Sequence, residues 1–409
     1  MKLGIVVYKF PAAANTFVVH EVCELVKAGV DVHIWSFGKS GDNEYEMFKD
    51  ELDLIGRENI SICNDRKRKE HLFAWGVFNE HFVPFSENEP RKVLDSFTDQ
   101  EIVRNEEELA VERSGKCVEL ISKDVKSKGI THIYAPFAGA DAEICMFISK
   151  KLDIPLFFSC HAYDLFVKFG YPIEKMKAVT KIFSISNFNK KYLMNEYGYP
   201  EDKIRIKRVS YIGETNVKPK SFNHKYIVGA GRLAHMKGFH NSIQAFSEFN
   251  KSFPDVHYYI LGEGDMRKNL ENQIKELNLT DRVHLVGHVS NKEVMSYIKN
   301  CEFSILTSVT QKNKDMEGLP TVFVESLSLG KPCIGTNYSG VPEIIKNGKT
   351  GYVCEEDDIK SISKKMITLY KEVNNFIKIR SYNKKCKDAL KEFDLSKNIK
   401  IMIEEFQKC

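Results

Sequence analysis

The chain has 409 residues, which fits two domains of about 200 residues better than one hydrophobic core. Its apolar fraction of 43% and charged fraction of 28% are typical of a soluble globular protein, and no apolar run reaches the length of a membrane span. The net charge of +4 is too small to indicate a nucleic-acid-binding protein. An apolar run follows Met1 almost at once and reads as a buried strand, so we expect no signal peptide. The ten scattered cysteines, without a Cys-x-x-Cys pair, indicate a reducing cytoplasm.

Short apolar runs alternate with amphipathic stretches along most of the chain, which predicts an α/β protein with parallel sheets covered by helices. In the first half the predicted strands are residues 3–8, 32–36, 132–135, 156–160 and 182–185. Glycines end the predicted helices 16–28 and 101–128. In the second half the predicted strands are residues 226–230, 257–261, 283–286, 303–306 and 332–335. The polar stretch 213–223 is the predicted linker, and residues 358–409 are predicted to be helical.

Residues 57–82 depart from this alternation, and the basic and aromatic part of this segment is residues 66–82. It carries the basic run Arg66–Lys69, followed by Phe73, Trp75, Phe78 and Phe82. A basic and aromatic segment can seat a protein on an anionic membrane surface. The alternative is a surface helix whose aromatic side chains pack inward.

The strongest chemical signal is the segment from Glu317 to Glu325, which has the sequence EGLPTVFVE. Glu317 lies in a loop, and Thr321 is predicted to cap the helix that carries Glu325. The start of a helix offers unpaired N–H groups and partial positive charge, which suits a phosphate group. A carboxylate accepts two hydroxyl donors, so Glu325 suits ribose or sugar hydroxyls. The alternatives are a buried structural carboxylate, or a glycoside hydrolase pair facing one substrate.

A second signal is the glycine-rich loop from Gly229 to Gly238, which follows a predicted strand and opens a helix. Gly231 allows the backbone to approach a ligand, and Arg232 and Lys237 can reach that ligand from the same loop. Arginine grips phosphate with two hydrogen bonds and lysine acts as a point charge, so the pair suits a diphosphate. The alternative is a tight turn with two solvated cations.

Two other nucleotide-binding motifs fit this loop poorly. A dinucleotide-binding motif needs a third glycine and an acidic residue about 20 residues on, whereas Glu263 comes about 30 residues on. A Walker-type loop needs Ser or Thr after the lysine, and Lys237 is followed by Gly238.

A third signal is His161, which follows the predicted strand 156–160. Ligands of open α/β sheets bind at the carboxyl ends of strands, so His161 is predicted to face a cleft. Its imidazole can donate to a sugar hydroxyl, and Asp164 can orient it or cap the next helix. A lone histidine is more often structural.

No Asp-x-Asp sequence occurs in the chain, so the usual carboxylate pair that holds a divalent ion on a diphosphate is missing. We therefore expect no metal ion and no other cofactor, with the diphosphate charge met by Arg232, Lys237 and helix starts.

With these residues the chain resembles glycosyltransferase family four, a retaining family with the two-domain GT-B fold. Four segments of the second half have the order and spacing of the family: 229–238, 261–264, 283–289 and 317–325. Residues 335–343, which end in Gly-Val-Pro-Glu343, also match. Phe10-Pro11 with Thr16-Phe17, and His161–Asp164, resemble bacterial members that build surface polysaccharides such as colanic acid.

The resemblance implies a role for each matching residue. Gly231, Arg232 and Lys237 would bind the donor diphosphate, together with backbone N–H groups of Gly318, Leu319 and Thr321 around Pro320. Glu325 would hold the ribose, Glu317 the transferred sugar, and Val289 would lie near the base. His161 would contact the donor sugar beside the reacting carbon. Phe10, Asn15, Thr16 and Asp164 would lie on the acceptor side, although the loop 9–15 lacks the glycines of many family members.

The resemblance also implies an activity and a domain organisation. Residues 1–215 would form an acceptor-binding Rossmann-like domain, residues 222–385 a nucleotide-sugar-binding one, and residues 386–409 a helix crossing back to the first domain. The expected reaction moves a hexose from UDP or GDP to a saccharide or lipid-linked saccharide, in the cytoplasm or at the inner face of the membrane. The rival hypotheses are a nucleotide-sugar epimerase, a phosphorylase and a non-catalytic sensor.

Overall fold

The computed structural model describes residues 1–12, 15–38, 40–62, 118–166, 170, 172–210, 215–311 and 316–409. The predicted membrane-contact segment 66–82 and the first part of the predicted helix 101–128 lie outside these ranges; residues 118–128 are helical. Within the described ranges we find no helix with the length and hydropathy that crossing a membrane requires.

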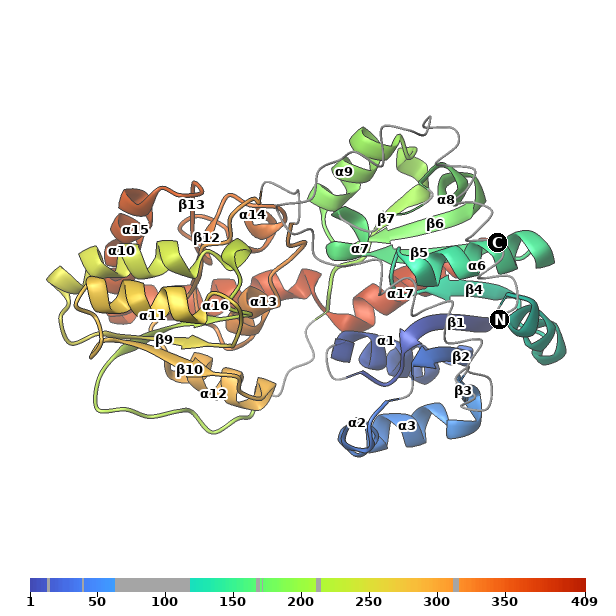
Figure 1. Cartoon of the computed structure of the whole chain (residues 1–409), viewed down its shortest axis with the longest axis horizontal. Coiled ribbons are helices and arrows are strands. Elements are labelled where there is room, and N and C mark those ends of the chain that lie inside the picture. The colour runs from blue at the N-terminus through green and yellow to red at the C-terminus, as the bar shows by residue number, and fades with distance from the viewer. Residues whose placement is uncertain are drawn as a thin grey trace, which may run out of the picture. The chain divides into compact units, whose positions relative to one another are not determined.

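The first sheet has seven strands in the order β3-β2-β1-β4-β5-β6-β7 (Figure 1). Their bounds are β1 Lys2–Lys9, β2 Asp31–Gly38, β3 Ile60–Ile62, β4 His132–Ala135, β5 Leu156–Cys160, β6 Val179–Ser184 and β7 Ile204–Ile206. The pairs β1–β2, β1–β4, β2–β3 and β4–β5 are parallel, with Leu3 opposite Val32 and His132. Parallel pairing follows from the helices that connect successive strands.

The second sheet has six strands in the order β10-β9-β8-β11-β12-β13, again with parallel pairs. Their bounds are β8 Tyr226–Ala230, β9 His257–Leu261, β10 Val283–Gly287, β11 Ser304–Leu306, β12 Cys333–Thr336 and β13 Gly351–Cys354. Numbered within this sheet, the order is 3-2-1-4-5-6, which is the Rossmann order. The strand order reverses between β8 and β11, so a ligand is expected at the carboxyl ends of these two strands.

Helices alternate with the strands in both halves, and further helices follow the last strand. In the first half they are α1 Thr16–Lys27, α2 Asp42–Met47, α3 Lys49–Ile55, α6 Ala140–Leu152, α7 Tyr163–Phe166, α8 Pro172–Ala178 and α9 Asn187–Tyr197. In the second half they are α10 Phe239–Ser252, α11 Arg267–Glu276, α12 Asn291–Asn300, α13 Thr321–Ser328, α14 Val341–Ile344, α15 Ile359–Val373, α16 Phe376–Ala389 and α17 Leu395–Phe406. The predicted helical character of residues 358–409 is confirmed.

The chain divides into two compact units. One comprises Met1–Ser159, Gly170–Ile182 and Glu405–Cys409, and the other comprises Cys160–Phe169 and Phe183–Glu404. The end of the chain is anchored within the first unit, because Phe406 is fully buried and its ring packs edge-on against Phe157 at 4.7 Å. Glu405 pairs with Lys181 at 3.4 Å in the same unit.

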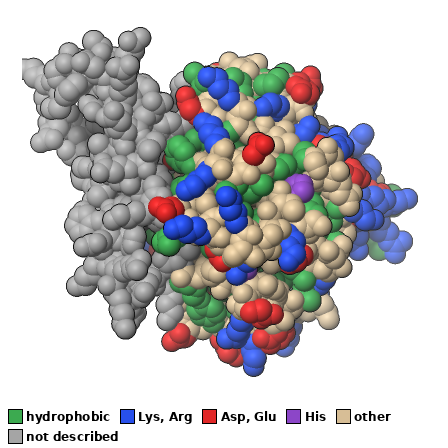
Figure 2. All heavy atoms as spheres, turned by 90° about the vertical axis from the view of Figure 1, so that its right-hand side faces the viewer, with side chains coloured by type: hydrophobic (Ala, Val, Ile, Leu, Met, Phe, Trp, Pro, Cys, Tyr) green, Lys and Arg blue, Asp and Glu red, His purple; other side chains and the backbone are tan. Residues whose placement is uncertain are grey.

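The side of the structure that faces right in Figure 1 carries both chain ends, and Figure 2 shows it from the front. Lys and Arg side chains are spread over its described part, and Asp and Glu side chains gather toward its lower edge (Figure 2). Charge on this face is therefore mixed.

Candidate active site

The reversal of strand order in the second sheet brings together the loops that follow β8 and β11. The loop after β8 carries Arg232 and the short 3-10 helix His235–Lys237, and the segment after β11 carries Ser308 and Glu317. Gly238, in the first loop, lies directly against the segment after β11. Its φ is positive, at 64°, and a Cβ there would lie 1.7 Å from the carbonyl oxygen of Thr307. No residue other than glycine fits this close approach without a backbone shift.

Lys237 and Glu317 form an ion pair between their side chains, each of which is 16% exposed. The other carboxylate oxygen of Glu317 accepts a hydrogen bond from Ser308 Oγ at 3.3 Å. The backbone N–H of Glu317 donates to the hydroxyl of Tyr338 at 2.6 Å. The structure therefore brings together two residues that are 80 positions apart, and both were candidates from the sequence.

Arg232 lies in the same loop with an exposed side chain. Its guanidinium approaches Met236 Sδ at 4.0 Å and forms no ion pair with any residue that the structure describes. Gly231, beside it, has a φ of 155°, and a Cβ there would lie 3.5 Å from Lys237 Cε. Among the described residues, the loop thus presents one cation without an ion pair and one paired cation side by side.

Glu325 lies in the second turn of α13 and is half-buried. Its Oε1 accepts a hydrogen bond from Asn291 Nδ2 at 3.0 Å, at the start of α12. Burial raises the pKa of the Glu325 carboxyl above its usual range, although the Asn291 hydrogen bond opposes the rise. A partly desolvated carboxylate with one oxygen held in place is suited to accept hydroxyl groups with the other.

The start of α13 follows Gly318, Leu319 and Pro320, all buried. Thr321 was predicted to cap this helix, and that prediction is wrong: the N-cap is Pro320, without a side-chain hydrogen bond, and Thr321 is the first helical residue. The N–H of Phe323 donates to Pro320 O at 3.2 Å, whereas the described residues supply no backbone partner to the N–H groups of Leu319 and Thr321. These two N–H groups can donate hydrogen bonds to a phosphate oxygen.

Gly318 lies against the backbone of His161. A Cβ at Gly318 would lie 2.7 Å from His161 O and 2.8 Å from Ile185 Cδ1. The structure therefore brings the His161 segment, which follows β5, next to the Glu317–Gly318 segment. Asp164 lies inside α7, and its carboxylate accepts the backbone N–H of His161 at 3.1 and 3.2 Å. It therefore holds the backbone of His161, and its predicted roles of orienting the imidazole or capping the next helix stay predictions.

The predicted acceptor residues of the first loop belong to the first unit. Phe10 is 1% exposed, and its N–H donates to Ser36 Oγ at 2.9 Å. Asn15 is half-buried and precedes α1, whose first residue, Thr16, is exposed. In the second unit, Val289 is half-buried and packs against the core.

Three residues near these side chains were not predicted: Ser308, Tyr338 and Asn291. Ser308 and Tyr338 follow β11 and β12, so their position at the carboxyl ends of predicted strands was a usable signal. Asn291 is the first residue of a capped helix. Its contact with Glu325 arises from the packing of the two helices, which no local sequence pattern predicts.

In the part of the chain that the structure describes, no group of three or more His, Cys, Asp and Glu side chains could hold a metal ion. Metal independence stays a prediction.

Comparison with known proteins shows which family this part of the chain is similar to. Residues 214–388 match the model of the family described as glycosyl transferases group 1. This segment, less than half of the chain, is similar to the group 1 glycosyltransferases.

The curated relatives match this chain over unequal lengths. The putative colanic acid biosynthesis glycosyltransferase WcaL of Escherichia coli is 28% identical over 177 residues, which is 42% of this chain and 43% of that protein. The amylovoran biosynthesis glycosyltransferase AmsK of Erwinia amylovora is 23% identical over 404 residues, 90% of each chain. The match to WcaL thus spans less than half of that relative's length.

Solved structures establish the fold of the whole chain. A glycosyltransferase from Rickettsia africae superposes with a TM-score of 0.72 at 16% identity, covering 100% of this chain and 98% of that one. HepE of Anabaena, solved in complex with UDP, superposes with a TM-score of 0.69 at 14% identity over 100% of both chains. The predicted GT-B fold is confirmed.

Proposed function

We propose that this glycosyltransferase moves a hexose from a nucleoside diphosphate sugar to an acceptor hydroxyl, with retention of the anomeric configuration. The observation that carries the proposal is the grouping of Arg232, Lys237, Glu317 and the start of α13 at the strand-order reversal of the second sheet. The structure of HepE with UDP-glucose supports a nucleotide-sugar donor, because that protein shares the fold.

The diphosphate would lie between the cations of the first loop and the start of α13. Arg232, exposed and without an ion pair among the described residues, is available to a phosphate group, and the N–H groups of Leu319 and Thr321 add fixed partial positive charge. Negative charge grows on the leaving phosphate during transfer, so donors fixed in advance lower the barrier. Metal-independent transfer would rest on these groups.

Entry of the diphosphate would change the partner of Lys237. In the structure its ammonium pairs with Glu317, and a phosphate oxygen would compete for it. The released Glu317 carboxylate could then accept hydroxyl groups of the transferred sugar. Glu325 would hold the ribose, Val289 would lie near the base, and His161 would contact the donor sugar beside the reacting carbon.

In the proposed step, the acceptor oxygen forms a bond to the anomeric carbon as the bond from that carbon to the phosphate oxygen breaks. The acceptor proton passes to the leaving phosphate on the same face. The sequence shows no credible nucleophile on the enzyme for a double displacement. The resemblance to the family implies front-face attack instead.

The acceptor is proposed to be a saccharide or lipid-linked saccharide of a bacterial surface polysaccharide. The names of AmsK and WcaL, which refer to amylovoran and colanic acid biosynthesis, support this assignment. Phe10, Asn15, Thr16 and Asp164 are the proposed acceptor-side residues. We propose a cytoplasmic enzyme associated peripherally with the inner face of the membrane, where lipid-linked acceptors are available.

The test is product analysis with UDP-glucose, UDP-galactose, UDP-N-acetylglucosamine and GDP-mannose, each with and without lipid-linked saccharide extract and EDTA. We expect nucleotide release that depends on the extract, resists EDTA and yields a glycoside with the donor's anomeric configuration by NMR. Inversion of the configuration would refute retention. An isomerised sugar nucleotide, or release only with inorganic phosphate, would identify an epimerase or a phosphorylase instead.

A further inference from the structure

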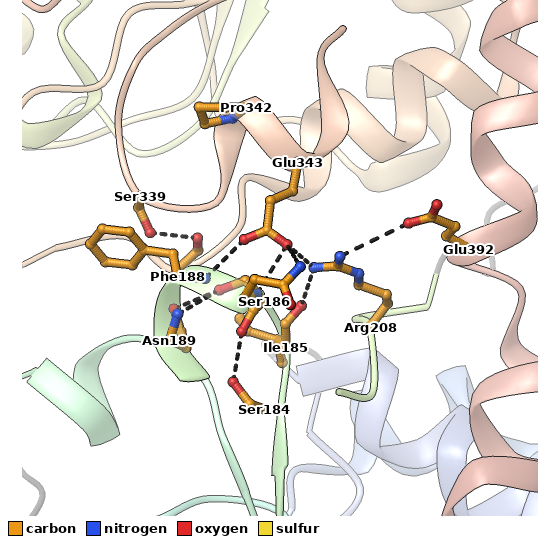
Figure 3. A network of polar contacts seen from close by, with 12 residues as sticks. Ser184, Ile185, Ser186, Phe188, Asn189, Arg208, Ser339, Pro342, Glu343 and Glu392 are labelled. Carbon is orange, nitrogen blue, oxygen red and sulfur yellow. Dashed lines mark hydrogen bonds and ion pairs between the residues drawn. The ribbon is translucent and has the colours of Figure 1, made fainter. Parts of the chain in front are cut away.

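The carboxylate of Glu343 in α14 binds the start of α9, more than 150 positions away in the sequence. It accepts the backbone N–H groups of Asn187 at 3.0 Å and Phe188 at 2.9 Å, and Asn187 Nδ2 at 2.9 Å (Figure 3). Asn187 and Phe188 are the first two residues of α9, whose N–H groups have no partner within the helix. A negative charge at this end of a helix is also favoured by the helix dipole.

Arg208 neutralises the charge of Glu343. Its guanidinium forms an ion pair with the Glu343 carboxylate and donates to Ile185 O at 3.3 Å (Figure 3). The two side chains are only 10% and 16% exposed. Burial raises the pKa of Glu343, but the backbone N–H groups of α9 and the charge of Arg208 outweigh it, so that the pKa is lowered. Glu343 is therefore ionised at neutral pH.

The loop that leads into α14 holds the backbone of the proposed sugar-binding segment. Tyr338 accepts the N–H of Glu317 at 2.6 Å, and Ser339 Oγ donates to Gly318 O at 2.8 Å. The N–H of Gly340 donates to the same carbonyl at 3.2 Å. Three successive residues of this loop thus fix the position of Glu317 and Gly318.

The start of α9 holds the backbone of His161. Asn189 Nδ2 donates to His161 O, and Ser186 Oγ donates to Asn189 Oδ1 at 2.9 Å, which sets the orientation of the amide. Gly318 lies against the same His161 carbonyl. Glu343 therefore links the two segments that carry Glu317 and His161.

We propose that Glu343 is a positioning residue that sets the backbone of Glu317 relative to that of His161, and so aligns the sugar end of the donor for transfer. This inference rests on the proposed function of these two residues. None of the contacts of Glu343 involves Arg232, Lys237 or Glu325. Loss of its charge should therefore impair turnover and leave nucleotide binding intact.

The test compares Glu343→Gln and Glu343→Asp with Glu392→Gln as the matched control. Glu392 also lies near Arg208, at 3.9 Å, but its side chain is 64% exposed and ends outside the linked segments (Figure 3). The measurements are kcat for nucleotide release from the sugar nucleotide that the wild type uses, and the Kd of the free nucleotide by calorimetry.

Glu343→Gln should lower kcat by about 100-fold, because a displacement of about 1 Å in the aligned groups costs that much. The Kd of the nucleotide should stay within about threefold of the wild type. Glu343→Asp, which keeps the charge, should recover part of the loss in kcat. Glu392→Gln should match the wild type in both quantities.

Hydrogen exchange on the full chain separates this inference from the proposed function. Glu343→Gln should raise exchange at both 161–166 and 316–320, and Glu392→Gln should not. Unchanged exchange, or a kcat equal to that of Glu392→Gln, would overturn the inference. If the wild type turns over none of the four sugar nucleotides, the proposed function fails on that panel, and the exchange comparison still decides whether Glu343 links the two segments.

Discussion

At the scale of single residues, Arg232 offers the sharpest test of the proposed diphosphate site, because its side chain is exposed and has no ion pair among the described residues to disturb. Arg232→Ala should lower kcat by about 10²–10³-fold, since it removes a charged donor from the leaving phosphate. Its midpoint of thermal unfolding should equal that of the wild type. Steady-state nucleotide release and a thermal scan measure both quantities, and a kcat within about threefold of wild type would refute the assignment.

Because Lys237 and Glu317 form an ion pair, we expect Glu317→Gln to affect nucleotide binding and turnover in opposite ways. Lys237 would lose its charged partner and become available to the diphosphate, so the free nucleotide should bind at least as tightly as to the wild type. Turnover should fall by about 10–100-fold, because the sugar hydroxyls lose a charged acceptor. Calorimetry and initial rates on the same protein separate the two effects. Weaker nucleotide binding would show that Glu317 supports the diphosphate site directly.

The candidate residues could be predicted from the sequence where a single short motif contains them. Arg232 and Lys237 share one loop, and Glu317 and Glu325 flank one helix start. Asn291, Tyr338 and Glu343 could not be assigned roles in this way, because their partners lie 34, 21 and 135–156 positions away. Contacts at such distances are set by packing of the sheet and its loops, which no local pattern encodes.

At the scale of elements, buried strands were predicted well, and three short strands at sheet edges were missed. The predicted bounds of β4, β5, β8 and β9 agree with the structure residue for residue. The strands β3 and β7 have three residues each and are only partly buried, so their hydrophobic signal is weak. The strand β13 begins at Gly351 and lies at the edge of its sheet, which weakens the pattern in the same way.

Three histidines at the edge of the second sheet make its stability depend on pH. The rings of His224 and His257 stack with their centroids 3.6 Å apart, and His257 Nδ1 lies 2.8 Å from His284 Nε2. Burial, the other two histidines and Arg282 together lower the pKa of His257 to about 4, and Asp255 opposes this change. Burial also lowers the pKa of His224 and His284, where Arg282 acts in the same direction and Asp281 opposes it at His284.

A lowered histidine pKa means that the unfolded chain binds more protons, so stability is complete above about pH 6.5 and is lost as the pH falls toward 4. The free energy of unfolding should drop by about 1 kcal/mol between pH 7 and pH 5, after allowance for solvent screening. Urea titrations of His257→Phe, which keeps a stacked ring, should show a flatter pH dependence. His288→Gln, an exposed histidine, is the control, and equal slopes in the two variants would contradict this account.

At the scale of the whole molecule, the nucleotide end of the proposed site lies within one compact unit. Arg232, Lys237, Glu317 and Glu325 all belong to the unit that contains Phe183–Glu404, and to the segment that matches the group 1 family. Nucleotide binding should therefore be measurable without an acceptor. The domain boundaries predicted at residues 215, 222 and 386 stay predictions.

The most direct test of the central claim is a thermal-shift measurement with UDP, GDP and ADP in the presence of EDTA. At 100 times its Kd, the nucleotide of the natural donor should stabilise the fold by roughly 2.7 kcal/mol. The shift should be lost in Arg232→Ala and Glu325→Ala. If no nucleotide shifts the unfolding of the wild type, and calorimetry at millimolar nucleotide detects no binding, the chain does not use a nucleoside diphosphate sugar.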